Sequence, residues 1–488
     1  MSRQALPFAG GFYVSESTGI LNSRCVNFRP VVLERPGLNN RALFGSDGIT
    51  EVADTGSGSS RGVIKFSDGT PYRVIGNSLV SISSAGAITT LGTITGSSNV
   101  SMASNGINIA IQDPKGDSYF YTPGATTLEL NSNAVFLSFG QAESVAFKDG
   151  YYVYSTSAKI FSGSAKTTND GKNFTATDFE DAEISPDKIT KVWNNHNELN
   201  VMGEWTTEKF STTATSGFPF ERIGEGGAMV QKGCAAPNSV VDFASTFAFL
   251  GGGQDEKPAV YLMSAQPFKI STAAIEQMIH ANSEAVISAA TAFSYSSKGN
   301  NFYVLTVGSN TFVYDFDASV LAGGPVWHER QTGVTNGEGF QVWRAKHGIK
   351  VYGEIQVGDD RSGKIGRIET GVYTEYGDTI ERFFTTQPFS ADGDPIFSNE
   401  IELEIESGVG NATTPDPQIR MDYSDNGGKT FSNEIARSIG KIGEYKQRVR
   451  WSRLGRIPQH RTPRFKMSGS VSCNIYNLYA SAEGSTGG

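Results

Sequence analysis

Cysteine, histidine and charged residues are all scarce in this chain of 488 residues, which has three cysteines, five histidines and 19% charged residues. Cys25, Cys234 and Cys473 are odd in number and far apart, so they allow neither a disulfide framework nor a CxxC metal knuckle. The opening MSRQALPFAGGFY has no apolar signal segment, and no run of 18 apolar residues occurs anywhere. We therefore expect a protein that folds in a reducing cytoplasm, without a cleaved export signal and without membrane insertion.

Motifs that carry enzyme chemistry are also missing. The histidines occur singly, without the HxH or HExxH spacing of metal sites and without a recognisable triad: His196, His280, His328, His347 and His460. No GxxxxGK[ST] or strand-linked GxGxxG is present to hold a nucleotide phosphate. The sequence predicts no catalytic residue, no cofactor and no metal, and hence a protein that is not an enzyme.

Glycine (56), phenylalanine (30) and tyrosine (18) are abundant, as is typical of short strands joined by many turns. A weak repeat of two alternating apolar strands with a glycine or polar break occurs seven times between residues 61 and 370. Its spacing of about 44 residues matches a four-stranded propeller blade. The copies cover 72–82, 107–122, 151–163, 199–212, 247–264, 301–316 and 349–368. We predict a mainly β fold with a β-propeller of about seven blades; six blades or an array of sandwiches are the alternatives.

The chain is expected to divide into four parts. Residues 1–60 form an N-terminal segment, 61–372 the propeller, 373–480 a C-terminal antiparallel β-sandwich and 481–488 a flexible tail. One helix stands out, because Ser271 and Thr272 are candidate N-caps and Ile275, Met278 and Ile279 share one helical face. It is expected to pack on a blade edge, with partner binding as the alternative.

Positive charge is concentrated near the C-terminus. The chain has 41 Lys and Arg against 50 Asp and Glu, a net charge of −9, but residues 420–466 hold twelve Lys or Arg against four acids. Within 445–456, Arg448 and Arg450 share one strand face and Val449 and Trp451 the other. The candidate residues for partner or subunit contact are Arg448, Arg450, Arg453 and Arg456. A solvated strand, salt bridges across an interface, and DNA phosphate contact all remain open.

The turn SDNGGKTF (424–431) approximates the Asp-box pattern Ser-x-Asp-x-Gly-x-Thr-aromatic. Its candidate residues are Ser424, Asp425, Gly427, Thr430 and Phe431. Asp boxes occur in sialidases and other glycan-processing propellers, but the box itself is a self-bonded hairpin tip. Sialidase chemistry also needs an arginine cluster and a Tyr nucleophile, which no pattern here indicates. A structural turn is expected, and a glycan-binding or glycan-hydrolysing propeller of a receptor-binding apparatus is the alternative function.

Several segments, in order along nearly the whole chain, resemble one family. They are RCVNFRP (24–30), MVQKGCAAPNSVVDF (229–243), VYLM (260–263), QPFKISTAAIEQMI (266–279) and RVRWSRLGR with the following PRFK. This pattern is similar to the packaged-DNA stabilisation proteins of short-tailed bacteriophages, also called tail hub, tail accessory factor or nozzle-type proteins. Within it, the segment 232–237 is expected to serve the fold, since Gly233 and Pro237 shape the backbone and Cys234 is core-like.

The resemblance implies a structural protein of the virion tail that is assembled in the bacterial host cytoplasm. Several copies, six in the better-known relatives, form a ring-shaped hub below the portal and adaptor complex. The N-terminal segment 1–60 is then expected to contribute to ring closure or adaptor contact. The ring extends the channel for packaged double-stranded DNA, helps to retain that DNA, and anchors a needle, spikes or fibres. Electrostatics adds a hypothesis: acidic blade loops along the channel would repel DNA phosphates and let the genome slide.

Overall fold

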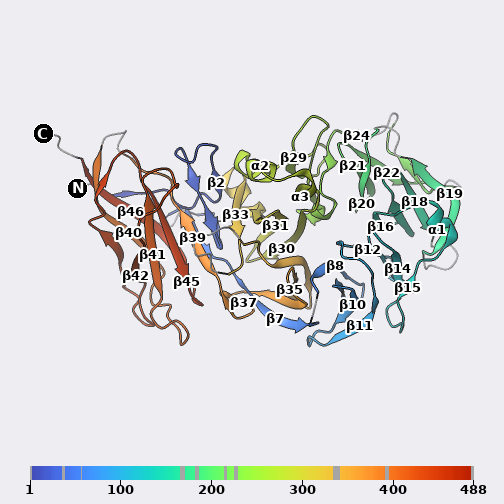
Figure 1. Cartoon of the computed structure of the whole chain (residues 1–488), viewed down its shortest axis with the longest axis horizontal. Helices are drawn as coiled ribbons and strands as arrows, with labels where there is room; N and C mark the ends of the chain where they lie inside the picture. The colour runs from blue at the N-terminus through green and yellow to red at the C-terminus, as the bar shows by residue number, and fades with distance from the viewer. Residues whose placement is uncertain are drawn as a thin grey trace.

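Seven antiparallel sheets surround a common centre in the larger of two lobes (Figure 1). The computed structural model describes residues 3–35, 39–56, 58–164, 171–181, 186–213, 217–224, 229–333, 341–390 and 395–484. Blade 1 comprises β8 (Ser60–Lys65), β9 (Pro71–Ile75), β10 (Ser78–Ile82) and β11 (Ile88–Thr93). Blade 2 comprises β12 (Ser101–Ser104), β13 (Ile109–Gln112), β14 (Ser118–Tyr121) and β15 (Glu129–Leu130). Blade 3 comprises β16 (Ser144–Lys148), β17 (Tyr151–Ser155), β18 (Lys159–Ser164) and β19 (Asn173–Asp181).

The next blades follow the same order. Blade 4 comprises β20 (Ile189–Asn195), β21 (Glu198–Gly203), β22 (Thr207–Thr212), β23 (Phe220–Arg222) and β24 (Met229–Val230), and blade 5 comprises β25 (Gly233–Cys234), β26 (Val241–Phe243), β27 (Thr246–Gly252), β28 (Ala259–Leu262) and β29 (Phe268–Lys269). Blade 6 comprises β30 (Thr291–Ser297), β31 (Asn300–Val307), β32 (Asn310–Asp315) and β33 (Val326–Arg330), and blade 7 comprises β34 (Ala345–Val351), β35 (Glu354–Asp359), β36 (Lys364–Glu369) and β7 (Gly48–Asp54).

The blades close into a ring because each buries its two apolar faces against its neighbours. Among the described residues, a separate hydrophobic cluster fills each gap between successive blades, including the gap between blades 7 and 1. The inner strands β8, β12, β16, β20, β30 and β34 contact one another around the centre, and blade 5 joins through β25 and β26. The predicted β-propeller of about seven blades is confirmed, and each repeat found in the sequence covers the central hairpin of one blade.

Hydroxyl side chains near the starts of the inner strands join one blade to the next. Ser101 Oγ of blade 2 donates to Val145 O of blade 3 over 3.2 Å and accepts from its N–H over 3.1 Å. Ser144 Oγ accepts from Val192 N over 3.0 Å, and Thr190 Oγ1 donates to Cys234 O over 3.1 Å. These bonds satisfy backbone groups that no strand of the same blade reaches.

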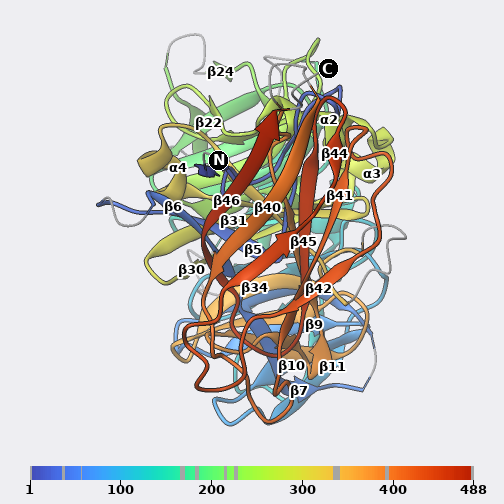
Figure 2. The same cartoon turned by 90° about the vertical axis from the view of Figure 1, so that its left-hand side faces the viewer.

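The smaller lobe is a β-sandwich (Figure 2). One sheet comprises β43 (Val449–Ser452), β40 (Ile396–Ile405), β46 (Asn474–Gly484), β6 (Arg41–Gly45) and β5 (Phe28–Val32), with β1 (Arg3–Ala5) on β46 and β44 (Arg456–Ile457) on β40. The other comprises β4 (Cys25–Val26), β39 (Glu381–Thr385), β45 (Thr462–Ser468), β41 (Gln418–Ser424) and β42 (Ile435–Ser438). Trp451, Phe465 and Leu43 are among the buried residues between the sheets.

The domain boundaries differ from those expected from the sequence. Residues 1–60 are divided among both sandwich sheets, a short hairpin of β2 (Tyr13–Val14) and β3 (Asn22–Ser23), and blade 7, which β7 completes. The short strands β37 (Thr374–Glu375) and β38 (Asp378–Thr379) extend the sheet of blade 7, so the sandwich begins after them. Residues 481–484 belong to β46 and are not a tail, because they pair with β40; residues 485–488 lie outside the described part.

A continuous sheet joins the two lobes. Val26 of β4 pairs in parallel with Glu329 of blade 6 and antiparallel with Phe383 of the sandwich. Asn27, which is fully buried with φ of 54°, then turns the chain from one sandwich sheet to the other. Its Nδ2 donates to Glu381 O over 2.7 Å and to Gln331 O over 3.0 Å, so one side chain links the propeller to the sandwich.

The helices are short and lie on the propeller. They are α1 (Ala134–Ser138), the 3-10 turn η1 (Pro237–Ser239), α2 (Ala273–His280), α3 (Glu284–Ser288) and α4 (Phe316–Ala322). The helix predicted around residues 271–279 is confirmed: Thr272 Oγ1 accepts from Ile275 N over 3.3 Å at its N-cap, and Ile275 and Ile279 are buried. Ser271 instead donates to Glu276 over 2.9 Å, so Thr272 alone is the N-cap.

One buried histidine, His328, and one half-buried histidine, His347, predict a loss of stability in acid. Burial lowers the pKa of His328 and of His347 well below the usual 6.5, and neighbouring cations such as Arg330 act in the same direction. Because the unfolded chain takes up a proton near pH 6.5 and the folded chain does not, the free energy of unfolding should fall as the pH drops below about 6.5. The expected slope is about 1.4 kcal/mol per pH unit for each histidine. Urea unfolding at about pH 7.5 and about pH 5.5 measures it.

A variant separates this effect from that of the buried carboxylates. Burial raises the pKa of Glu375 and Asp315, and such groups favour the folded state at low pH and lose that contribution as the pH rises. His328→Phe should remove the proton uptake of one histidine and leave the carboxylates unchanged. If the free energy of unfolding of this variant changed with pH as steeply as that of the wild type, His328 would not contribute to the acid sensitivity.

Candidate interaction surfaces

The basic strand predicted near the C-terminus is β43, an edge strand that pairs with β40. Arg448 donates from Nε and Nη2 to the two carboxylate oxygens of Glu402, both over 2.8 Å. Arg450 Nε lies 3.2 Å from Glu402 Oε2, and its Nη1 lies 3.8 Å from Glu400 Oε2. Both arginines therefore neutralise acids of the neighbouring strand, of which Glu402 is buried.

Arg453 and Arg456 have a different environment. Both are exposed, and Arg453 has a left-handed backbone with φ of 58° between β43 and β44. Among the described residues no ion pair involves either side chain. Of the four candidate arginines, these two present charges that are not already used within the chain.

The positive charge of the C-terminal region is balanced once the fold brings its acids alongside. Residues 381–484 contain thirteen Lys or Arg and thirteen Asp or Glu, so this C-terminal part of the sandwich is neutral and the whole charge of −9 lies in residues 1–380. Arg464 pairs with Asp422 over 2.6 Å, and Arg420 with Glu381 over 3.0 Å. The sequence count over 420–466 overstated the asymmetry because the acids on β39 and β40 precede that window.

The Asp-box-like turn is a self-bonded hairpin tip. Ser424 Oγ accepts from Gly428 N over 2.8 Å and donates to Asn426 Oδ1 over 2.8 Å. Asn426 Oδ1 also accepts from Thr430 N over 2.9 Å, while its Nδ2 donates to Thr430 Oγ1 over 2.7 Å. Asn426, which the sequence analysis did not single out, occupies the position of the Asp in the pattern. That position was its only sequence signal.

The remaining turn residues make contacts outside the turn. Asp425 pairs with both Nε and Nη2 of the buried Arg461, each over 2.7 Å. Arg464 lies 3.5 Å from the centroid of the Phe431 ring. Gly427 has φ of 71°, and a Cβ there would lie 2.9 Å from the backbone of Gly19, so the turn docks closely on the N-terminal hairpin.

Replacing Asn426 tests which residue holds this turn. Asn426→Ala should lower the free energy of unfolding by about 1–2 kcal/mol, because three hydrogen bonds of the turn are lost. Asn426→Asp keeps the Oδ1 acceptor, and the Thr430 hydroxyl can reverse to donate, so its effect should stay below about 0.5 kcal/mol. Urea unfolding measures both, with the exposed Lys429→Ala as a control; equal effects of all three would contradict this assignment.

The segment 232–237 serves the contact between blades 4 and 5. Gly233 has no room for a side chain, because a Cβ there would lie 2.3 Å from Trp205 N. Cys234 and Ala236 are fully buried, and Pro237 begins η1. Burial raises the pKa of Cys234 to about 11 and lowers that of the nearby Lys191, whose Nζ lies 3.3 Å from Ser101 Oγ, to about 8.

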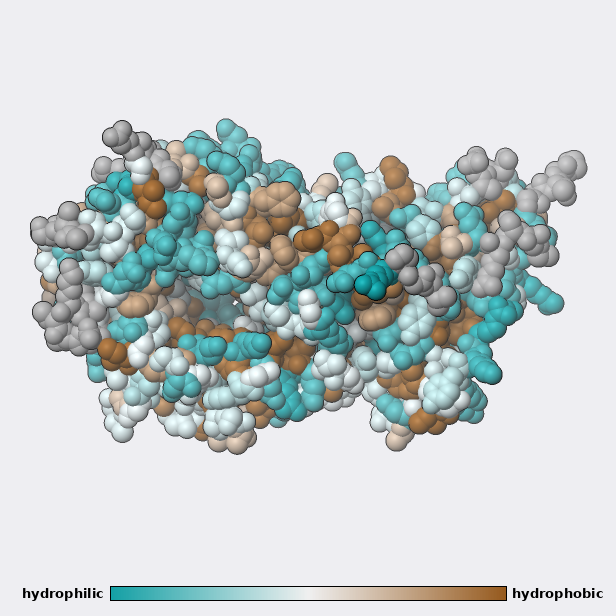
Figure 3. Space-filling model, turned by 180° about the vertical axis from the view of Figure 1, so that it is seen from behind, coloured by the Kyte–Doolittle hydropathy of each residue, from teal (hydrophilic) through white to brown (hydrophobic). Residues whose placement is uncertain are grey.

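The centre of the propeller is hollowed on the face seen in Figure 3. A cavity of about 610 Å3 lies where the inner strands end. Its lining comes from blades 4 to 7: Asn194, Asn195, His196, Asp242, Phe243, Ala244, Ser245, Thr246, Ser294, Tyr295, Ser296, Asn301, Gly348, Ile349 and Lys350. No arginine is among these residues, so the cluster that a sialidase needs for its carboxylate substrate is not formed at this mouth.

In the described ranges no group of three or more His, Cys, Asp or Glu side chains is placed to hold a metal ion. No described helix is long and apolar enough to cross a membrane.

Two family descriptions match the chain in order. "Bacteriophage P22 Gp10, beta-propeller" matches residues 4–373, and "Bacteriophage P22 Gp10, beta-sandwich" matches residues 381–483. No curated protein matches the chain significantly. Together the two matches span both lobes.

Several solved structures match the chain at low sequence identity. The N-terminal domain of Nup159 is 9% identical over 71% of this chain and 98% of that chain, with a TM-score of 0.39. The beta-propeller domain of Myceliophteria thermophila Cps50 (Swd1) is 9% identical over 66% and 99%, with a TM-score of 0.38. The WD40 beta propeller domain of Doa1 is 11% identical over 66% and 97%, with a TM-score of 0.36. At these TM-scores the likeness carries no argument about function.

Proposed function

Since the chain belongs to the bacteriophage P22 Gp10 family of packaged-DNA stabilisation proteins, and is thus a structural protein of a phage tail, we propose that several copies form a ring-shaped hub below the portal and adaptor complex. The match of both family descriptions, in order and over both lobes, carries this proposal. In such a ring, six copies extend the DNA channel, help to retain the packaged DNA, and anchor a needle, spikes or fibres. Assembly takes place in the host cytoplasm.

The rigidity of the chain supports a structural role. The sheet that runs from blade 6 through β4 into the sandwich, and the bonds of Asn27 on both sides of it, hold the lobes in a fixed relation. Arg24 adds an ion pair to Glu329 at the same junction. A subunit of a channel wall must resist the pressure of packaged DNA without hinge motion, and a buried junction held by a continuous sheet supports this.

Charge supports an assignment of lobes within the ring. Because residues 381–484 are neutral and residues 1–380, which include all seven blades, carry the charge of −9, the propeller is the lobe that repels DNA phosphates. We place propeller loops along the channel, where the genome slides past, and the exposed Arg453 and Arg456 of the sandwich at a contact with an adjacent subunit or the adaptor. A lumen lined mainly by Lys and Arg would overturn this placement.

Electron microscopy of the protein mixed with the portal and adaptor complex of its virion tests the hub. A ring that caps the adaptor and is coaxial with the portal is expected, while the protein alone serves as control. The double variant Arg453→Glu, Arg456→Glu should decorate the adaptor less than the matched variant Lys429→Glu, since only the first reverses charges at the proposed contact. Free monomers beside an undecorated adaptor would contradict the hub function.

A further inference from the structure

The cavity at the mouth of the propeller has the size of a ligand site. Its volume of about 610 Å3 falls within the range of roughly 300–1,000 Å3 typical of small-molecule pockets. Four blades contribute to it, through the ends of β20, β26, β30 and β34 and the hairpin turns that follow β20 and β26. None of these residues is used in the proposed contacts of the tail hub.

The mouth is held in shape before any ligand binds. Ala244 and Ser245 both have left-handed backbones, with φ of 50° and 65°, and His196 has φ of 54°. Such conformations cost roughly 1–2 kcal/mol each for residues other than glycine, so the surrounding fold must impose them. Ser294 Oγ donates to Asp242 O over 2.8 Å, which ties blade 6 to the turn of blade 5. A preorganised backbone lowers the entropy lost on binding.

Exposed polar side chains of both kinds, donors and acceptors, line this cavity. Asp242 accepts from Trp193 Nε1 through Oδ1 over 3.1 Å, which leaves Oδ2 as an acceptor. His196 bonds Asn195 through Nδ1 over 2.8 Å, which leaves Nε2. Within the described part of the chain, Asp242 Oδ2, His196 Nε2 and Lys350 Nζ have no hydrogen-bond partner. They supply one charged acceptor, one imidazole nitrogen and one ammonium donor around a single opening.

Apolar surface accompanies these groups. Ile349 and the partly buried Tyr295 line the same cavity, and the half-buried Trp193 lies behind Asp242. Sugars present this combination of surfaces, because their hydroxyl groups both donate and accept while their C–H faces pack on aromatic and aliphatic side chains. A carboxylate can accept from two neighbouring hydroxyls at once. The Asp242 charge and the absence of arginine from the lining disfavour acidic sugars.

We propose that the propeller mouth formed around His196, Asp242 and Lys350 is a binding site for a neutral oligosaccharide. The site binds without cleaving, since Asp242 is the only carboxylate among the lining residues and glycoside hydrolysis uses two. It is separate from the assembly surfaces and does not depend on the hub function.

Saturation-transfer NMR with the full chain tests the site. The probes are lactose, maltotriose and N,N′-diacetylchitobiose at millimolar concentration, with 3′-sialyllactose as the acidic comparison. We expect transfer to at least one neutral probe and less to 3′-sialyllactose. Asp242→Asn keeps the bond from Trp193 and should weaken binding about tenfold or more, because a hydrogen bond to a charged acceptor is lost.

Asp360→Asn is the matched control, since Asp360 is an exposed acid paired with Lys346 outside the mouth. It should leave binding unchanged. The proposal is overturned if no neutral probe binds, if the acidic probe binds more tightly than lactose, or if Asp242→Asn and His196→Ala both bind as the wild type does. It is also overturned if a lysine-rich peptide binds at the mouth and no sugar does, which would make this a peptide site.

Discussion

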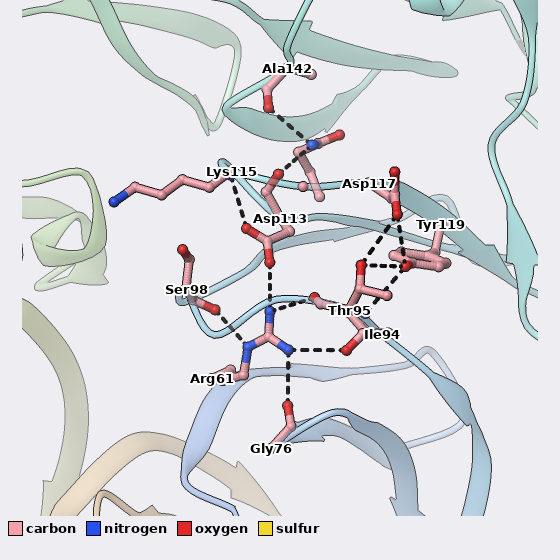
Figure 4. A network of polar contacts seen from close by, with 12 residues as sticks. Arg61, Gly76, Ile94, Thr95, Ser98, Asp113, Lys115, Asp117, Tyr119 and Ala142 are labelled. Carbon is pink, nitrogen blue, oxygen red and sulfur yellow. Dashed lines mark hydrogen bonds and ion pairs between the residues drawn. The ribbon is translucent and has the colours of Figure 1, made fainter.

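Replacing Asp113 by asparagine is expected to lower the free energy of unfolding by about 3–5 kcal/mol, because it leaves the buried Arg61 guanidinium without its counter-charge. The two side chains are 3% and 1% exposed, and Arg61 Nη2 lies 2.7 Å from Asp113 Oδ2 (Figure 4). Arg61 also donates to Ser98 O over 2.7 Å and to Gly76 O over 2.9 Å, so it cannot turn to solvent without breaking further bonds. Burial already lowers the pKa of Arg61, and Asp113 opposes that effect.

Urea unfolding measures this change in the free energy of unfolding, and an exposed ion pair serves as the control. Glu354 lies 2.9 Å from Arg367, and the two side chains are 37% and 36% exposed. Glu354→Gln should therefore cost about 1 kcal/mol or less. If Asp113→Asn cost no more than Glu354→Gln, the contact between blades 1 and 2 would not depend on this pair.

Asn27→Ala should have an effect of similar size, about 4 kcal/mol, for a different reason. It removes three hydrogen bonds between the Asn27 side chain and buried backbone groups. Asn27 Nδ2 donates to Glu381 O and Gln331 O, and Asn27 Oδ1 accepts from Gln331 N over 3.1 Å. Alanine also tolerates φ of 54° less well than asparagine does.

Asn27→Gly separates the two contributions. Glycine loses the same hydrogen bonds but adopts the left-handed backbone without strain, so it should be less destabilising than alanine by about 1–2 kcal/mol. Urea unfolding gives the free energy of unfolding of both variants. Small-angle X-ray scattering of the folded variants reports whether the two lobes keep their relative position. Equal costs for the two variants would show that only the side-chain bonds matter.

The propeller could be predicted from sequence because each blade is built from consecutive hairpins. A local alternation such as that of residues 151–163 is enough to mark the centre of a blade, since its partners lie within the same stretch. The placement of residues 1–60 could not be predicted in this way. Their strands pair with β46, β33 and β36, hundreds of residues away, and strands of two to seven residues carry little periodic signal of their own.

The candidate sites show the same limit. The alternation in 448–451 indicated which side chains share a face, but it could not indicate that Glu402 lies beside Arg448, because that pairing depends on the register of β40. Asn426 was missed because the pattern requires Asp at that position, although the amide oxygen fills the same role. The mouth cavity comes from four blades whose contributing residues lack any common motif.

The pairing of the first and last described strands has a consequence for synthesis on the ribosome. Arg3 lies opposite Ser481 and Ala5 opposite Tyr479. Strand β1 therefore cannot pair with β46 until almost the entire chain has been translated. Strand β7 waits likewise for β36 before blade 7 can form. Blades 1 to 6 consist of local hairpins and can fold as they emerge, while the strands of the sandwich near the N-terminus stay unpaired. The completed subunit therefore forms only when the C-terminal strands have left the ribosome.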